Sequence, residues 1–91
     1  MTGWCELCGC FSTIERHHVF GGRGRRKIAE QHKMVAYICT ECHRGPNGVH
    51  NNRETDLKLK RKYQQLFEQK HTREEFMALF GRNYLTEEEG I

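Results

Sequence analysis

The sequence predicts a small α+β domain, in which two short strands precede one long and one short C-terminal helix. At 91 residues and 36% hydrophobic content, the chain is long enough for one small core. Apolar runs before residue 40 are strand-sized, whereas apolar residues after residue 52 recur at helical spacing. We therefore expect a single domain over residues 1–91, with a core over 1–50, helices over 51–81 and a tail over 82–91.

Two Cys-x-x-Cys pairs provide four thiolates at the spacing of a zinc site, and 30 residues separate the pairs. The expected ligands are Cys5, Cys8, Cys39 and Cys42. Four thiolates close a tetrahedral shell, so a structural Zn²⁺ there would stabilise the fold and leave no open position for chemistry. The odd cysteine, Cys10, is expected to be a spectator thiol, although it is close enough in sequence to compete for zinc.

The first half of the chain predicts two strands joined by a basic loop. Residues 1–13 are expected to form a turn around the first cysteine pair, followed by a strand over 14–20. The glycine-rich segment Gly21–Arg26 predicts a loop, and residues 28–33 predict at most one helical turn. The apolar run Met34–Ile38 predicts a second strand, which delivers the second cysteine pair.

The second half predicts helices with clear start signals. The second cysteine pair opens a short helical turn that ends at Gly45–Gly48. Asn51-Asn52 is an N-cap signal for a helix over 53–70, and Thr72–Glu75 is a capping box for a last helix over 73–80. The apolar face of the long helix is predicted to consist of Leu59, Tyr63, Leu66 and Phe67.

Basic residues gather in two short segments, although the formal net charge is only +3. Four zinc-bound thiolates carry −4 and the ion +2, so a filled site lowers the net charge to +1. Net charge therefore gives little support for a nucleic-acid partner, and the position of the charge is more informative. The first cluster comprises Arg23, Arg25, Arg26 and Lys27, and the second Lys58, Lys60, Arg61 and Lys62. A charge run alone is usually a solvated surface.

Three histidines accompany the cysteine pairs: His17 and His18 on the first predicted strand, and His43 after the second pair. Neighbouring side chains on a strand point to opposite faces, so one histidine of the dipeptide is expected to bind an ion while the other faces a substrate. An imidazole titrates near neutral pH and is suited to taking a proton from water. The alternative is one buried, hydrogen-bonded histidine beside a solvated one. His32 and His71 are expected to lie on the surface.

The order of these residues is Cys-x-x-Cys, Glu15-x-His17-His18, a Gly-Gly loop and Cys-x-x-Cys-His43. Over about residues 4–50 it resembles the HNH endonucleases, which have the ββα-metal, or His-Me finger, fold. The resemblance implies that His17 and His43 bind a catalytic divalent cation, that His18 is the general base and that Glu15 orients a neighbouring group. It implies hydrolysis of DNA phosphodiester bonds with one Mg²⁺, Mn²⁺, Ni²⁺ or Zn²⁺ ion.

The chain departs from the pattern of this family at two places. The family usually has an asparagine about five residues before the second cysteine pair, where this sequence has Met34. The family helix normally continues through the second metal ligand, whereas Gly45-Pro46 interrupts it here. The third ligand is therefore open between Asn47, at helical spacing from His43, and His50 beyond the turn.

The resemblance also implies the partners. It places the first basic cluster near the substrate, so Arg23, Arg25, Arg26 and Lys27 are expected to bind DNA phosphates with little sequence specificity. The segment from residue 45 to 54, followed by a basic helix, is similar to small HNH proteins of phages and prophages. A phage terminase or recombination protein is then a candidate partner. The alternative function is a zinc-stapled module that binds nucleic acid or protein without hydrolysis.

The sequence also predicts a location in the cytoplasm of a bacterial host. No apolar run approaches the length of a membrane span. The chain starts without the charged segment and apolar run of a signal peptide, so we expect reduced, zinc-binding cysteines rather than disulfides. No membrane partner is expected.

Overall fold

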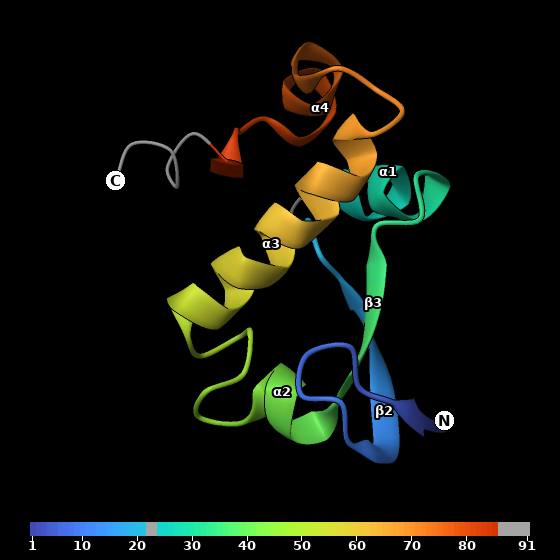
Figure 1. Ribbon diagram of the computed structural model, residues 1–91, viewed down its shortest axis with the longest axis vertical. Helices are drawn as coiled ribbons and strands as arrows, with labels where there is room; N and C mark the ends of the chain where they lie inside the picture. The colour runs from blue at the N-terminus through green and yellow to red at the C-terminus, as the bar shows by residue number, and fades with distance from the viewer. Residues whose placement is uncertain (22–23, 86–91) are drawn as a thin grey trace.

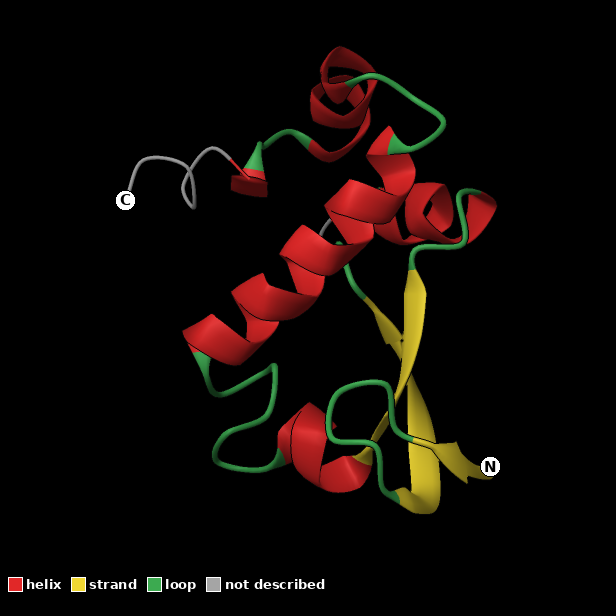
Figure 2. Ribbon diagram, in the orientation of Figure 1, coloured by secondary structure: helices red, strands yellow, loops and turns green. Residues whose placement is uncertain are grey.

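Three strands form one antiparallel sheet in the computed structural model, which describes residues 1–21 and 24–85. The strands follow the order β1-β2-β3, so each pairs with its neighbour in the chain. Their bounds are β1 Thr2–Trp4, β2 Phe11–His18 and β3 Val35–Cys39. The strands gather on one side of the molecule, and the long helix α3 crosses obliquely beside them (Figures 1 and 2). The predicted α+β class is confirmed.

The central strand β2 begins and ends earlier than the predicted strand over 14–20. Because Thr2–Trp4 pairs with its first residues, the segment 1–13 contributes a short strand and the start of β2 as well as a turn. Val19 and Phe20 follow the strand as buried residues, 1% and 2% exposed. An apolar run does not show whether its residues pair in a sheet or pack beyond it, so the boundary was misplaced.

A helix occupies part of the segment that was predicted as a basic loop. α1 spans Arg25–Gln31 and begins after Gly24, whose backbone is left-handed with φ 79°. Arg25, Arg26 and Lys27 therefore lie on its first turn, not in an irregular loop. The helix buries Ala29, which is 0% exposed, and it contacts β2 and α4. Its seven residues are too few to show helical periodicity, so burial of this one face against distant residues was not predictable.

β3 connects directly to the short helix α2, Thr40–Arg44, as the sequence predicts. Ala36 and Ile38 on β3 are completely buried, whereas their neighbours on the other face are half-buried. Cys39 ends the strand and caps the helix, because its Sγ accepts a hydrogen bond from the Cys42 amide at 3.4 Å. The strand thus delivers the second cysteine pair and His43 to one end of the sheet.

The long helix α3 spans Arg53–Glu68 and begins at Asn52, whose side chain accepts a hydrogen bond from the Thr55 amide at 3.2 Å. Its predicted apolar face is correct except for Leu66, which is 45% exposed. Gln64 is buried in its place. The cost of burying this amide is offset because it donates to Glu68 and Asn83 and accepts from the backbone of Tyr84.

The last helix, α4, spans Arg73–Phe80 and has the predicted capping box between Thr72 and Glu75. Its apolar side packs into an aromatic cluster at the end of the sheet opposite α2 (Figure 1). The rings of this cluster belong to Phe20, Phe67, Phe76, Phe80 and Tyr84. The chain stays packed as far as Leu85, which is 7% exposed. No helix within the described residues is both long and apolar enough to cross a membrane.

Candidate functional site

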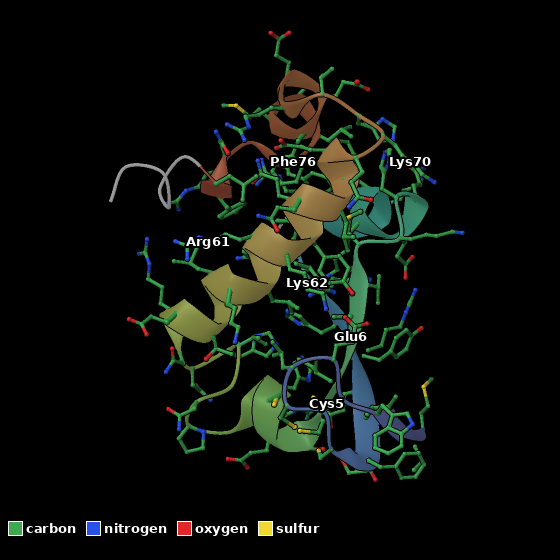
Figure 3. The ribbon with its side chains drawn as sticks, viewed as in Figure 1. Cys5, Glu6, Arg61, Lys62, Lys70 and Phe76 are labelled. Atoms are coloured by element: carbon green, nitrogen blue, oxygen red, sulfur yellow. The ribbon has the colours of Figure 1, made fainter. Side chains whose placement is uncertain are left out.

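Four cysteines from three segments meet at the α2 end of the sheet. Cys5 and Cys8 lie in the turn after β1, Cys39 ends β3 and Cys42 lies in α2, and all four Sγ atoms are within 4.8 Å of one another. Figure 3 shows Cys5 beside α2. The Sγ atoms of Cys8 and Cys39 are 3.8 Å apart. This equals the edge of a tetrahedron with zinc–sulfur bonds of about 2.3 Å, roughly 3.8 Å.

The chemistry of these thiols fits a bound cation. Burial raises the pKa of Cys5, but hydrogen bonds from the amides of Cys8, Cys39 and Leu7 outweigh burial and lower it to about 6. Burial and the neighbouring thiols raise the pKa of Cys42 well above its usual value. Four thiolates so close together need a positive charge between them, so the cluster can hold a metal ion such as zinc. The exposed Cys10, with its Sγ 3.2 Å from that of Cys8, lies outside this set of four.

A second group of ligand atoms comes from three histidines. His17 lies on β2, His43 on α2 and His50 in the connection to α3, and their ring nitrogens are within 4.8 Å of one another. The Nε2 atoms of His43 and His50 face each other at 2.9 Å. The ring centroid of His17 is 5.1 Å from that of His43 and 5.2 Å from that of His50. One cation placed among the rings could accept a lone pair from each histidine.

The environment of His17 shows whether the three histidines are suited to bind a metal ion. Its side chain is 7% exposed, and its Nε2 atom is buried without a hydrogen-bond partner among the described residues. Burial, together with the charges of His43 and His50, lowers the pKa of His17 to about 4. The ring is therefore neutral at pH 7 and offers a lone pair. A buried nitrogen without a partner is costly, and a metal ion would satisfy it.

Glu15 fixes the second of these rings. Its Oε1 lies 2.6 Å from Nδ1 of His43, and its Oε2 accepts a hydrogen bond from Thr40. The bond from His43, reinforced by Arg44, lowers the pKa of Glu15 below its ordinary value. A carboxylate on Nδ1 leaves Nε2 of His43 free to bind a cation, which is a common arrangement around metal-binding histidines. The expected orienting contact of Glu15 is present.

Of the two residues that the sequence left open, His50 lies with the other two histidines. The turn that follows α2 folds back on itself, with the Val49 amide donating to Cys42 O at 2.8 Å and the His50 amide to His43 O at 3.3 Å. Asn47 faces elsewhere, since its side chain accepts a hydrogen bond from Asn52 at 3.4 Å. The structure therefore brings His50, and not Asn47, to the other two histidines.

His18 lies on the opposite face of β2 from His17, as the strand alternation predicts, but both line the same cleft because β2 ends there. Nε2 of His18 lies 3.3 Å from Oε1 of Glu30 on α1, and the same oxygen pairs with Arg16. Sequence reasoning did not single out Glu30. It lies in a segment without a periodic pattern, and its contact with His18 depends on how α1 packs on the sheet.

An open cleft of about 450 Å³ surrounds this second cluster. Its lining residues are Arg16, His17, His18, Gly21, Arg26, His43 and His50. It adjoins a second hollow of about 290 Å³, which shares three of these histidines and adds Asp56 and Lys60 from α3. A cleft lined by arginine and histidine side chains suits an anionic ligand better than an apolar one.

The predicted phosphate-binding residues are only partly brought to this cleft. Arg26 lines it, whereas Arg25 lies against Gly81 at the end of α4, and Lys27 is not part of the lining. Arg23 lies outside the described residues. His32 and His71 were expected on the surface but are half-buried. His32 meets Phe67 edge-on with ring centroids 5.5 Å apart, and His71 stacks on Phe67 with ring centroids 4.4 Å apart.

Comparisons with known protein families, with curated proteins and with solved structures found no match to this chain.

Proposed function

We propose that this protein is a metal-dependent endonuclease of the HNH type, which hydrolyses phosphodiester bonds in DNA. In this proposal β2, β3 and α2 form the ββα-metal unit, and the four cysteines hold a structural zinc ion beside it. The observation that carries the proposal is the histidine cluster. Three ring nitrogens converge within 4.8 Å, one of them buried without a partner, and a fourth histidine, His18, lines the same cleft.

The first role is to bind a catalytic divalent cation through His17, His43 and His50. When bound, the cation would provide Lewis-acid stabilisation for the scissile phosphate and for the leaving 3′-oxygen. Imidazole ligands suit Zn²⁺, Ni²⁺ or Mn²⁺, whereas Mg²⁺ prefers oxygen, so we expect several metals to support activity. Glu15 keeps the ring of His43 in the orientation that exposes Nε2.

The second role is to activate water, and we assign it to His18. Donation from Nε2 to Glu30 leaves the other ring nitrogen, Nδ1, as the acceptor for a proton from water. Glu30 then acts as a positioning residue, since it fixes the ring and does not need to touch the substrate. The chain after His18 is held by a hydrogen bond from the Val19 amide to Met34 O at 3.1 Å. These contacts supply the bracing for which the family uses an asparagine.

The third role is to bind the phosphate backbone, and we assign it to Arg26 and to Arg16, which also pairs with Glu30. Contacts of this kind do not read base edges, so we expect binding that falls with salt and shows little sequence preference.

The test is cleavage of supercoiled plasmid by the zinc-loaded protein with Mg²⁺, Mn²⁺, Ni²⁺ or added Zn²⁺. We expect metal-dependent nicking that His18→Ala lowers by about 10²-fold or more, because a positioned general base contributes on the order of 10²–10⁴. His32→Ala, which changes a histidine outside the cleft, is the matched control and should retain activity.

Two results would contradict the proposal. Full activity in a folded His18→Ala protein would remove the assigned base. No cleavage with any metal, in a folded protein that carries its zinc, would favour a zinc-stapled module that binds nucleic acid or protein. Cleavage that appears only after a phage terminase or recombination protein is added would instead identify a partner-dependent nuclease.

A further inference from the structure

The inward face of α3 changes from apolar to charged where the helix passes the histidine cluster. Leu59, Tyr63 and Phe67 on this face are buried in the core. Toward the start of the helix, the same stripe continues with Asp56 and Lys60, which form an ion pair at 2.7 Å. Residues four apart lie on one helix face, so the two charges replace apolar side chains at the edge of the core.

The ammonium group of Lys60 is held in place from two sides. Its Nζ bonds to Oδ2 of Asp56 and lies 5.5 Å from the centre of the Tyr84 ring, and the side chain is only 20% exposed. A lysine fixed in this way loses less conformational entropy when it binds a ligand than a surface lysine does. Helix stability alone does not require the pair at this position, because an ion pair on an exposed face of α3 would also stabilise the helix.

Lys60 also brings a basic side chain from a third element, α3, to the surroundings of the histidines. The hollow that it lines with Asp56 shares His17, His18 and His50 with the main cleft. The main cleft, which contains the same histidines, is lined by Arg16 and Arg26. Among the described residues that line the two hollows, basic side chains thus come from β2 and α1 in the main cleft and from α3 in the adjoining hollow.

We infer that Lys60 binds a phosphate of the DNA backbone next to the scissile phosphate, with Asp56 holding its ammonium group in the hollow. The bound strand then runs from Arg16 and Arg26, across the histidines, to the first turns of α3. One donor of the ammonium is used by Asp56, and the remaining donors are available to phosphate oxygens. The inference rests on the proposed nuclease function for its substrate, and it adds a substrate-binding residue that the sequence did not distinguish from its basic neighbours.

The experiment compares two variants that remove the same charge from the same helix. Lys60→Gln and Lys58→Gln are made in the zinc-loaded protein carrying His18→Ala, which is expected to slow cleavage of the probe. Binding of a fluorescein-labelled DNA duplex is then measured by anisotropy over a range of salt. Lys58 is exposed and does not line either hollow. We expect Lys60→Gln to weaken binding by about fivefold or more and to reduce the salt slope by about one. Lys58→Gln should change affinity by less than about twofold, and Lys60→Arg should retain most of the binding.

The possible results separate the Lys60 inference from the nuclease proposal. Equal effects of Lys60→Gln and Lys58→Gln would overturn the inference while leaving the nuclease proposal intact. A selective effect of Lys60→Gln on binding, in a protein whose unmodified form cleaves nothing with any metal, would support the phosphate contact and reject the nuclease. No DNA binding by the parent protein would overturn both. If Lys60→Gln melts at a lower temperature than the parent, Lys60→Met, which keeps the apolar stem against Tyr84, replaces it.

Discussion

His17 and His18 are adjacent in the chain but occupy different environments. The side chain of His17 points into the protein and is 7% exposed, whereas that of His18 faces the carboxylate of Glu30 at the rim of the cleft. Side chains alternate along a strand, so one dipeptide supplies both a buried imidazole and an accessible one. The division of labour that the proposed reaction needs therefore follows from strand geometry at two residues.

The pKa of His17 leads to a pH prediction for protein with no cation at the histidine cluster. In the folded state this pKa is lowered to about 4 by burial and by the other two histidines, whereas an unfolded chain takes up the proton near pH 6.5. The stability that neutral His17 contributes is therefore present above about pH 6.5 and is lost as the pH falls toward 4. NMR titration of the ring should show His17 neutral until about pH 4, and a midpoint near 6.5 would contradict the burial.

The connection between α2 and α3 decides where the third histidine lies. A methyl group added at Gly48 would lie 2.8 Å from the carbonyl oxygens of both Glu41 and Cys42. These atoms are backbone, so neither can rotate away. The close approach that only glycine permits here returns the chain to α2, and the hydrogen bond from His50 to His43 then follows.

Gly48→Ala should therefore weaken metal binding at the histidine cluster, although it changes none of the three histidines. We expect a loss of stability of about 1–3 kcal/mol from the backbone shift, and metal affinity at this cluster at least about tenfold lower. Gly21→Ala is the matched control, since a methyl group there meets nothing within 4 Å. Isothermal titration calorimetry with Ni²⁺, after zinc has been loaded at the cysteines, measures the metal affinity of each variant. Thermal unfolding measures their stability. Equal affinity in the two variants would show that the turn does not set the position of His50.

The elements differ in how far the sequence alone predicted them. The helices with N-cap and capping-box signals, α3 and α4, begin where these signals place them, because a cap is formed by residues within one turn. The short strand β1 was missed, and α1 was expected only as one helical turn over residues 28–33, because each is stabilised by a partner distant in sequence. The exposure of Leu66 and the burial of Gln64 were not predicted for a similar reason. Helical spacing identifies the apolar face of a helix, but it does not show which edge of that face the core covers.

At the scale of the whole molecule, the cysteine cluster connects the parts that form the second site. Cys39 joins β3 to α2, which carries His43. Glu6, next to Cys5, accepts a hydrogen bond at 2.6 Å from the hydroxyl of Tyr63 on α3, and Figure 3 shows it on the loop between Cys5 and that helix. A metal ion among the cysteines would therefore hold together the sheet, α2 and the helix that carries Lys60.

Removing that ion should unfold the domain. We expect Cys39→Ser to lose zinc and to lack a cooperative thermal transition, because the site contributes folding free energy on the order of 10 kcal/mol in small zinc domains. Cys10→Ser is the matched control and should keep one zinc per chain and its melting temperature. Native mass spectrometry and circular dichroism measure the two properties. Zinc retained by Cys39→Ser, or lost by Cys10→Ser, would mean that the ligand set is different.

The sequence by itself determined the residue types and spacings that chemistry requires: two cysteine pairs, a His-His dipeptide on a strand, a histidine after the second pair and the capped helices. Each of these features is formed by residues close together in the sequence, where the backbone geometry is predictable. Only the tertiary structure decided that His50 joins the cluster, that Glu30 meets His18 and that Lys60 lines the hollow beside the cleft. Each of these contacts joins segments whose distance is set by packing of the whole core, and no local pattern encodes that distance.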